Sequence, residues 1–332
     1  MSKFYSLEKF NALCAKMAAA YGVPSTDKMF SVDPPRAIKL LNAVQESDSF
    51  LALTSLLPTT DIAGDVVTSA ISGTVAGTTD TSAAERTPIE VDSRTKRSYL
   101  CQQVNFDWAI RYAIIDQWLR FGNYDSRVAQ MILRRIGLDL LLIGWYGESH
   151  AATSNRTTYP LLQDVHPGWL YDLKTNKPAN YITAEALTIG GAASTYKNLD
   201  SAAYDLLTLI PKEKRNGNER LIIGQGLLSH EIDVLLELHG RTPTEKQAMQ
   251  VMSKTFAGMK PEVPAGFPDK GLMVCDPAQL QRYVQDSSLR KQLLDNPKRD
   301  RVEHYQSENL DYKIGDLDCV VSLDYTKVEF GD

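Results

Sequence analysis

Residues 59–87, TTDIAGDVVTSAISGTVAGTTDTSAAERT, decide what kind of fold this chain can adopt. Thr, Ser, Ala and Gly dominate the stretch, Arg86 is its only basic residue, and it contains no aromatic residue. Short runs at Val66–Val67 and Ile71–Val75 predict strands that are joined through glycines. Because few large apolar groups are present, the segment cannot form a core of its own. We therefore expect a protruding β-hairpin arm or a disordered loop.

The segment that follows has the opposite character. It is rich in aromatic residues from Tyr99 to Trp118, and it then reads DSRVAQMILRRIGLDLLLIGW over residues 125–145. Apolar residues recur there every three or four positions, which predicts an amphipathic helix about 30 Å long at the standard rise per residue. Gly137 and Gly144 lie seven residues apart on one face of this helix. Another backbone could approach closely at these positions, or the glycines could simply be tolerated.

The N-terminal region predicts two further helices. Residues 6–21 carry one apolar stripe at spacings of three and four, made up of Leu7, Phe10, Cys14, Met17 and Tyr21. A stripe on a separate terminal helix needs a partner surface, which is either the chain's own body or another protein. After Gly22-Val23-Pro24 ends this helix, Pro34-Pro35 marks a stiff joint before a second helix at about residues 36–46.

The C-terminal half mixes helices and strands without a regular βαβ order. Helices are expected at residues 199–210 and 227–238, and buried strands at Leu221–Ile223, Met273–Val274 and Val320–Leu323. The fold class is therefore α+β. A length of 332 residues predicts about two domains.

Composition and charge narrow the functional class. Hydrophobic residues make up 43% of the chain and charged residues 23%, as in an ordinary globular protein. The formal net charge of −5 argues against a globally basic nucleic-acid binder, although an acidic shell around DNA remains compatible with it. The four dispersed cysteines predict buried, reduced thiols, and no signal peptide or membrane-spanning run is visible. We expect a protein that is made in the cytoplasm.

Motifs that carry catalysis are incomplete. The turn at residues 221–226 lacks both the GxGxxG pattern and the terminal Gly-Lys-Ser/Thr of a phosphate loop. His230-Glu231 begins like a zinc-protease helix, but Val234 stands where a second His is required. A hydrolase that uses Ser229 or Asp233 with His230 is the alternative from another class, although GxSxG is absent. We therefore expect no catalytic residue, no cofactor and no metal site.

Other polar residues have ordinary structural interpretations. His150, His166 and His304 are isolated in the sequence and are expected on the surface or in loops. The basic run 298–301 favours a subunit contact or pairing within the fold over nucleic-acid recognition. Charged strand ends and solvated loops are the expected setting of five carboxylates, namely Glu303, Glu308, Asp311, Asp316 and Asp318.

Several stretches taken together resemble the major capsid proteins of P-2-type tailed phages. They run in order along nearly the whole chain, with a thinner likeness between residues 172 and 295. The stretches are Gln45–Ser47 with Phe50-Leu51, Thr78–Thr81 with Glu85-Arg86, Cys101–Arg120, Gly144–Gly147, Thr153–Arg156, Leu161–Val165, Gly168–Leu170 and Asn296–Tyr312.

The resemblance implies a Hong Kong 97-type fold with five parts. Residues 1–58 would be the N-terminal arm and 59–98 the extended E-loop, which lies over a neighbouring subunit. Residues 99–198 would be the peripheral domain with its long spine helix, and 199–310 mainly the axial domain. Residues 311–332 would return as strands to the peripheral domain.

The resemblance also implies a function and partners. The chain would assemble with itself, as hexamers and pentamers, into the icosahedral head of a tailed phage. A scaffold protein, a maturation protease, a portal at one vertex and non-specifically contacted DNA would be its partners, with no membrane involved. The main alternative on the same fold is an encapsulin-like compartment shell.

Two sets of site residues follow from this resemblance. The first thirty or so residues are expected to be removed on maturation by a cut near Phe30-Ser31, after the apolar stripe has served assembly. The inter-subunit contacts of the E-loop are expected at Gly73, Gly77, Thr79, Glu85 and Arg86.

Overall fold

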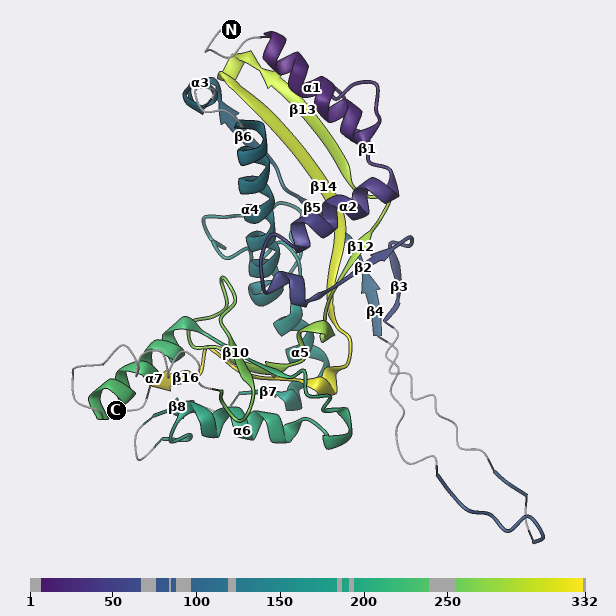
Figure 1. Ribbon diagram of the computed structural model, residues 1–332, viewed down its shortest axis with the longest axis vertical. Coiled ribbons are helices and arrows are strands. Elements are labelled where there is room, and N and C mark those ends of the chain that lie inside the picture. The colour runs from purple at the N-terminus through teal and green to yellow at the C-terminus, as the bar shows by residue number, and fades with distance from the viewer. Residues whose placement is uncertain are drawn as a thin grey trace.

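The structure, a computed structural model, consists of two sheets, a long helix and an arm (Figure 1). It describes residues 7–66, 76–83, 85–87, 97–118, 124–183, 187–190, 194–238 and 255–330. One sheet runs along the tall upper body and the other lies across the lower body. Short 3-10 turns occur at Leu51–Leu53, Pro178–Asn180, Lys212–Lys214, Pro277–Gln279, Pro297–Arg299 and Leu317–Cys319. The mixed helices and strands confirm the predicted α+β class.

The tall body is built around β14 (Arg301–Ile314), the longest strand described. Other strands pair with its backbone along both edges, so its side chains face the two sides of one continuous sheet alternately. The sheet order is β1 (Phe30–Ser31), β13 (Arg290–Asn296), β14, β12 (Leu280–Gln285) and β2 (Ser55–Thr59), and β5 (Gln102–Asn105) and β6 (Trp108–Arg111) also pair with β14.

The long helix predicted at residues 125–145 is confirmed as α4 (Tyr124–Tyr146). It packs on the long sheet, where the Tyr312 hydroxyl donates a hydrogen bond to the Leu140 carbonyl at 2.9 Å. Its two glycines allow close approach: a Cβ added at Gly144 would lie 2.3 Å from the Trp169 ring, and one at Gly137 would lie 2.6 Å from Ser47 Oγ. These notches receive α5 (Trp169–Asn176) and the end of α2 (Pro34–Gln45).

The lower body holds a smaller sheet whose centre is apolar. Its order is β10 (Lys260–Glu262), β9 (Arg220–Ile223), β11 (Leu272–Cys275), β15 (Val320–Leu323) and β7 (Tyr181–Ile182). The predicted strands at Leu221–Ile223, Met273–Val274 and Val320–Leu323 are all confirmed. Helices α6 (Leu199–Leu209) and α7 (Gln225–Leu238) accompany it, as predicted, with a small pair β8 (Leu187–Ile189) and β16 (Val328–Phe330).

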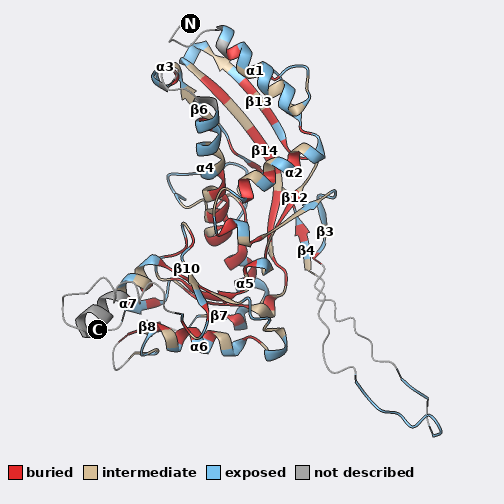
Figure 2. Ribbon diagram, viewed as in Figure 1, coloured by how far each residue is buried: buried red, intermediate tan, exposed pale blue. Residues whose placement is uncertain are grey.

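The predicted arm begins as a hairpin. Strand β3 (Ala63–Val66) pairs antiparallel with β4 (Arg97–Leu100), which confirms the strand expected at Val66. The described part of the tip, residues 76–83 and 85–87, is exposed throughout and stands away from the body (Figures 1 and 2). The strand expected at Ile71–Val75 lies outside the described residues.

The first helix, α1 (Leu7–Tyr21), packs against the chain's own body. Phe10, buried to 7% exposure, joins a cluster with Ile115 of α3 (Tyr112–Trp118), Leu293 of β13 and Val302 of β14. Of the two partners considered for the apolar stripe, the structure therefore shows the long sheet and α3 of the same chain.

Strand pairing divides the chain differently from the expected domain boundaries. Residues 280–310, expected mainly in the axial domain, lie in the long sheet beside the spine helix α4. Residues 320–323, expected to return to the peripheral domain, pair with β11 and β7 in the five-stranded sheet. The physical reason is that β14 is one continuous strand of 14 residues, which crosses the boundary expected at residue 310.

Candidate functional site

The root of the arm is fixed to the long sheet by aromatic packing. The rings of Tyr99 on β4 and Tyr283 on β12 stack with centroids 4.5 Å apart. The Tyr99 ring also covers Gly64 on β3, where an added Cβ would lie 2.7 Å from the Tyr99 hydroxyl oxygen. A side chain at position 64 would therefore displace the Tyr99 ring that stacks on Tyr283.

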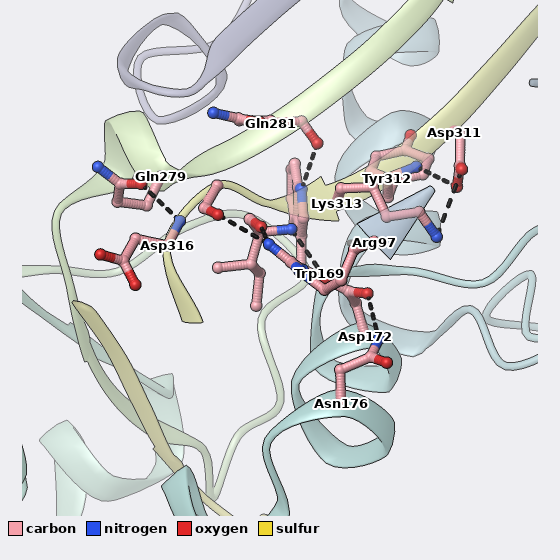
Figure 3. A network of polar contacts seen from close by, with 12 residues as sticks. Arg97, Trp169, Asp172, Asn176, Gln279, Gln281, Asp311, Tyr312, Lys313 and Asp316 are labelled. Atoms are coloured by element: carbon pink, nitrogen blue, oxygen red, sulfur yellow. Dashed lines mark hydrogen bonds and ion pairs between the residues drawn. The ribbon is translucent and has the colours of Figure 1, made fainter. Parts of the chain in front are cut away.

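A buried ion pair fixes the same root to α5 (Figure 3). Arg97 Nη1 lies 3.1 Å from Asp172 Oδ2, and the two side chains are 9% and 4% exposed. Arg97 Nη2 donates to the carbonyl oxygens of Ile314 and Gly315 at the end of β14. Asp172 also accepts from the Ile314 amide at 2.9 Å and from Asn176 Nδ2 at 2.8 Å. Because a buried charge is costly without partners, this network holds the arm in one orientation.

Asp311 on β14 makes a second buried attachment. Its Oδ2 accepts from the Leu100 amide on β4 at 2.7 Å, and Lys313 Nζ lies 3.4 Å from the same oxygen. His166 Nε2 lies 2.8 Å from Asp311 Oδ1, and both side chains are almost fully buried. The loop before α5, the arm's root and β14 therefore meet at one carboxylate.

A third group of charges lies where the chain passes between the two sheets. Lys214 Nζ lies 2.7 Å from both Asp316 Oδ2 and Asp318 Oδ2, and Lys177 pairs with Asp318 as well. Gln279 Oε1 accepts from the Asp316 amide at 2.9 Å (Figure 3). These contacts join the segments that leave β14 and enter β12, so they fix the angle between the sheets.

The expectation that all five carboxylates would be solvated is wrong for three of them. Glu303, Glu308 and Asp311 are 5%, 2% and 2% exposed, because β14 lies between other strands. Burial raises the pKa of Glu308, and the opposing charges of Arg282 and Lys291 reduce this shift. Hydrogen bonds from Tyr305 and Arg301 lower the pKa of Glu303.

Two of the three isolated histidines are also more buried than expected. His166 lies in a loop, as expected, but it is only 2% exposed, and its Nε2 lies 2.8 Å from Asp311 Oδ1. His304 stacks on Trp108 with ring centroids 4.7 Å apart, and burial lowers its pKa to about 3, with the nearby charge of Lys291 acting in the same direction. His150 hydrogen-bonds to the Val165 carbonyl at 2.6 Å and is exposed, as expected.

Four of the five predicted inter-subunit residues are exposed on the tip of the arm. Gly77, Thr79, Glu85 and Arg86 are all exposed, whereas Gly73 lies outside the described residues. A Cβ added at Gly77 would meet no atom within 4 Å. The tip is therefore available to another molecule, while its root is held rigidly.

The predicted cleavage residues Phe30 and Ser31 form β1, a two-residue strand at the edge of the long sheet. Phe30 pairs with Lys291 and Ser31 with Arg290. Ser31 is exposed and Phe30 is half-buried, so the peptide between them is extended and near the surface.

The residues considered for catalysis lie on α7. Ser229 and His230 are consecutive on α7, and the His230 ring stacks on Phe330 with centroids 4.8 Å apart. Nothing is described of the Asp233 side chain. Within the described ranges, no group of three or more His, Cys, Asp or Glu side chains is placed to hold a metal ion. No described helix is both long and apolar enough to cross a bilayer.

Sequence reasoning missed Arg97, Asp172 and Asp311, which hold the arm's root. The two partners of the central ion pair are 75 residues apart, and no local pattern joins them. Arg97 closely follows Arg94 and Lys96 in the sequence, and nothing in this basic run distinguishes the residue that becomes buried.

The chain is similar to known phage capsid proteins over almost its full length. The family model described as phage major capsid protein, P2 family, matches residues 9–326. Capsid proteins of Escherichia phage P2 are 30% identical over 342 residues, which cover 98% of this chain and 94% of the relative. The major capsid protein of Serratia phage KSP20 is 29% identical over 307 residues, with 89% and 88% covered.

Solved structures agree with this assignment. A chain of the satellite phage P4 procapsid including size determination (Sid) protein superposes with a TM-score of 0.79 at 28% identity, and 99% of each chain is covered. A chain of Microbacterium phage Oxtober96 gives a TM-score of 0.52 at 12% identity over 85% of this chain and 91% of that one, which supports the fold alone. These relatives favour a phage shell over an encapsulin-like compartment. The chain therefore belongs to the P2 family of phage major capsid proteins and has the Hong Kong 97-type fold.

Proposed function

We propose that this chain builds the icosahedral head of a tailed phage from hexamers and pentamers that enclose double-stranded DNA. The observation that carries this proposal is the contrast within the arm. Its root is held by the buried Arg97–Asp172 pair, whereas the described residues of its tip, 76–83 and 85–87, are exposed. A rigid root with an unpartnered tip suits an element that contacts a neighbouring copy, because little orientational freedom is then lost on assembly.

The charged residues at the tip allow this contact to be tested. Glu85 and Arg86 are adjacent, exposed and opposite in sign. Arg86→Glu should leave the folded subunit unchanged in thermal unfolding and should reduce the yield of closed shells in negative-stain electron microscopy. Arg86→Lys is the matched control, since it keeps the charge and should assemble normally. Equal shell yields from all three proteins would contradict a role of the tip in assembly.

The proposed partners are a scaffold protein and a maturation protease during assembly, a portal at one vertex, and the packaged DNA. With a net charge of −5, the shell would contact DNA non-specifically and weakly. Expression with a neighbouring scaffold gene should give closed shells or rings of five and six subunits. A persistent monomer would contradict the proposal.

We also propose that the maturation protease cuts near Phe30-Ser31. An extended strand at a sheet edge can enter a protease cleft once its few pairing contacts open, and β1 pairs through only two residues. Intact-mass analysis of mature particles should show the loss of the first thirty or so residues from the 37.0 kDa chain. Full-length chain in mature particles would contradict the cut.

A further inference from the structure

The segment that precedes the proposed cut covers the open edge of β13. The Leu293 amide donates to the Thr26 carbonyl at 3.2 Å, and the Val32 amide donates to the Leu289 carbonyl at 2.9 Å. Between these points β1 pairs with β13, with Phe30 opposite Lys291. The segment therefore satisfies backbone groups that would otherwise form an unpaired sheet edge.

The helix in the same segment covers an apolar groove. Phe10, Leu13 and Met17 of α1 pack over the cluster formed by Ile115, Leu293 and Val302. A cavity of about 410 Å³ remains between α1, α4 and the β13–β14 pair, with Trp108 and His304 among its lining residues. Loss of α1 would expose this groove along its length, as an apolar patch beside an open sheet edge.

Charges at this edge are also covered by the segment. Lys291 is 6% exposed, its Nζ donates to the Tyr21 hydroxyl at 3.0 Å, and it lies 5.1 Å from the centroid of the Tyr21 ring. Residues 1–30 carry four lysines and two acidic residues, so their removal changes the formal net charge from −5 to −7. The remaining body becomes more acidic, while the uncovered edge presents Arg290 and Lys291.

We propose that residues 7–30 act as a temporary cover, and that a second copy of this chain takes their place on the β13 edge and its groove after the cut. This inference rests on the cleavage proposed above. Every cleaved copy gains the same edge and groove, and another copy of the chain is available for each of them in a symmetric assembly. The basic edge and the more acidic body of another copy are complementary in charge. Pairing to an open strand edge supplies the backbone hydrogen bonds that the cover provided before.

Hydrogen exchange and crosslinking on assembled shells test this proposal. Shells of the full chain are prepared without and with the maturation protease, and intact mass first establishes the cut. In cleaved shells the Leu293 amide should exchange within about tenfold of its rate in uncleaved shells, because a new strand pairs with β13. The Val284 amide, inside the sheet on β12, serves as the control that should not change. Shells are also assembled from a mixture of isotopically labelled and unlabelled chains, and Lys291 is coupled to nearby carboxylates with a zero-length reagent. Crosslinks between one labelled and one unlabelled peptide should form in cleaved shells alone.

Three outcomes overturn the inference. Full-length chain after protease treatment would refute the cut and, with it, this inference. Cleaved shells in which the Leu293 amide exchanges about a hundredfold faster would keep the cut and refute the new partner. The cover would be intramolecular if the Leu293 amide stayed protected but no mixed-label pairs formed. The same would follow if the peptide of residues 1–30 remained bound in the shell at one copy per chain.

Discussion

The two sheets of this protein are stabilised in different ways. At the centre of the five-stranded sheet, β9, β11 and β15 contribute side chains that are almost all apolar and fully buried. The long sheet buries charged or titratable groups as well, namely Arg282, Lys291, Glu303, Glu308 and Asp311. Figure 2 shows buried residues along β14 and β12 and at the centre of the smaller sheet, so burial at the centre alone does not separate the two sheets.

The two sheets differ in the contacts that their buried side chains make with other segments. Apolar packing has no preferred direction, and it stabilises the lower body as a unit. The buried charges of the long sheet are directed at other segments: Asp311 bonds to the arm's root, and Lys291 bonds to α1. Directed polar contacts cost stability if they are left incomplete, so they fix the position of the elements that complete them. The long sheet is thus the part of the body that orients both the arm and α1.

The largest expected effect tests this role at the arm's root. Asp172→Ala leaves Arg97 and the Ile314 amide without their buried partner, and should reduce the free energy of unfolding by about 3–5 kcal/mol in urea denaturation. Asp172→Asn keeps an acceptor and should cost less. As a surface control, Asp205→Ala removes an exposed hydrogen bond to Tyr196 and should change stability by less than about 0.5 kcal/mol. A loss below about 1 kcal/mol for Asp172→Ala would contradict the buried clamp.

Lowering the pH should reduce the free energy of unfolding through His304, which lies on β14 of the long sheet. Its pKa falls to about 3 on folding, from an unfolded value of about 6.5, so its contribution is fully present above pH 6.5 and is lost as the pH falls toward 3. Between pH 7 and pH 4 this amounts to about 3 kcal/mol at 1.36 kcal/mol per unit. His304→Gln should remove this part of the acid sensitivity, as measured by urea denaturation at both pH values. The same pH dependence in the variant and the parent would contradict the assignment.

A substitution that creates a cavity beside the smaller sheet should reduce stability by an amount that does not depend on pH. Val274→Ala removes buried methyl groups from β11 and should cost about 2 kcal/mol. Because Val274 packs in a cluster of buried apolar side chains, the loss should be the same at pH 7 and pH 4. A loss that changed with pH would remove the distinction between the two sheets.

The smallest effect concerns Glu308. Its pKa is raised on folding, so its contribution is fully present below the unfolded value and is lost as the pH rises through the folded value. Glu308→Gln should therefore be neutral or stabilising by up to about 1 kcal/mol at pH 7. Glu303, whose pKa is lowered, gives the opposite sign, and Glu303→Gln should destabilise at pH 7. Thermal unfolding of the pair at pH 7 and pH 4 checks both signs.

The same difference explains what the sequence could predict. Apolar runs such as Leu221–Ile223 marked the smaller sheet, and periodicity marked the spine helix. Strand β14 reads RVEHYQSENLDYKI, and its polar composition concealed a buried strand whose neighbours lie far away in the sequence. For the same reason Glu303, Glu308 and Asp311 were expected at charged strand ends or in solvated loops. The arm was predictable because its scarcity of large apolar residues is a local property, whereas the Arg97–Asp172 contact that orients it joins residues far apart in the sequence.

Electron cryo-microscopy of shells assembled from the full chain tests the central claim most directly. The account predicts that residues 76–87 lie on a neighbouring copy, while Arg97 keeps its pairing with Asp172 in every subunit. Arm tips that fold back onto their own subunit, or that contact nothing in a closed shell, would contradict it.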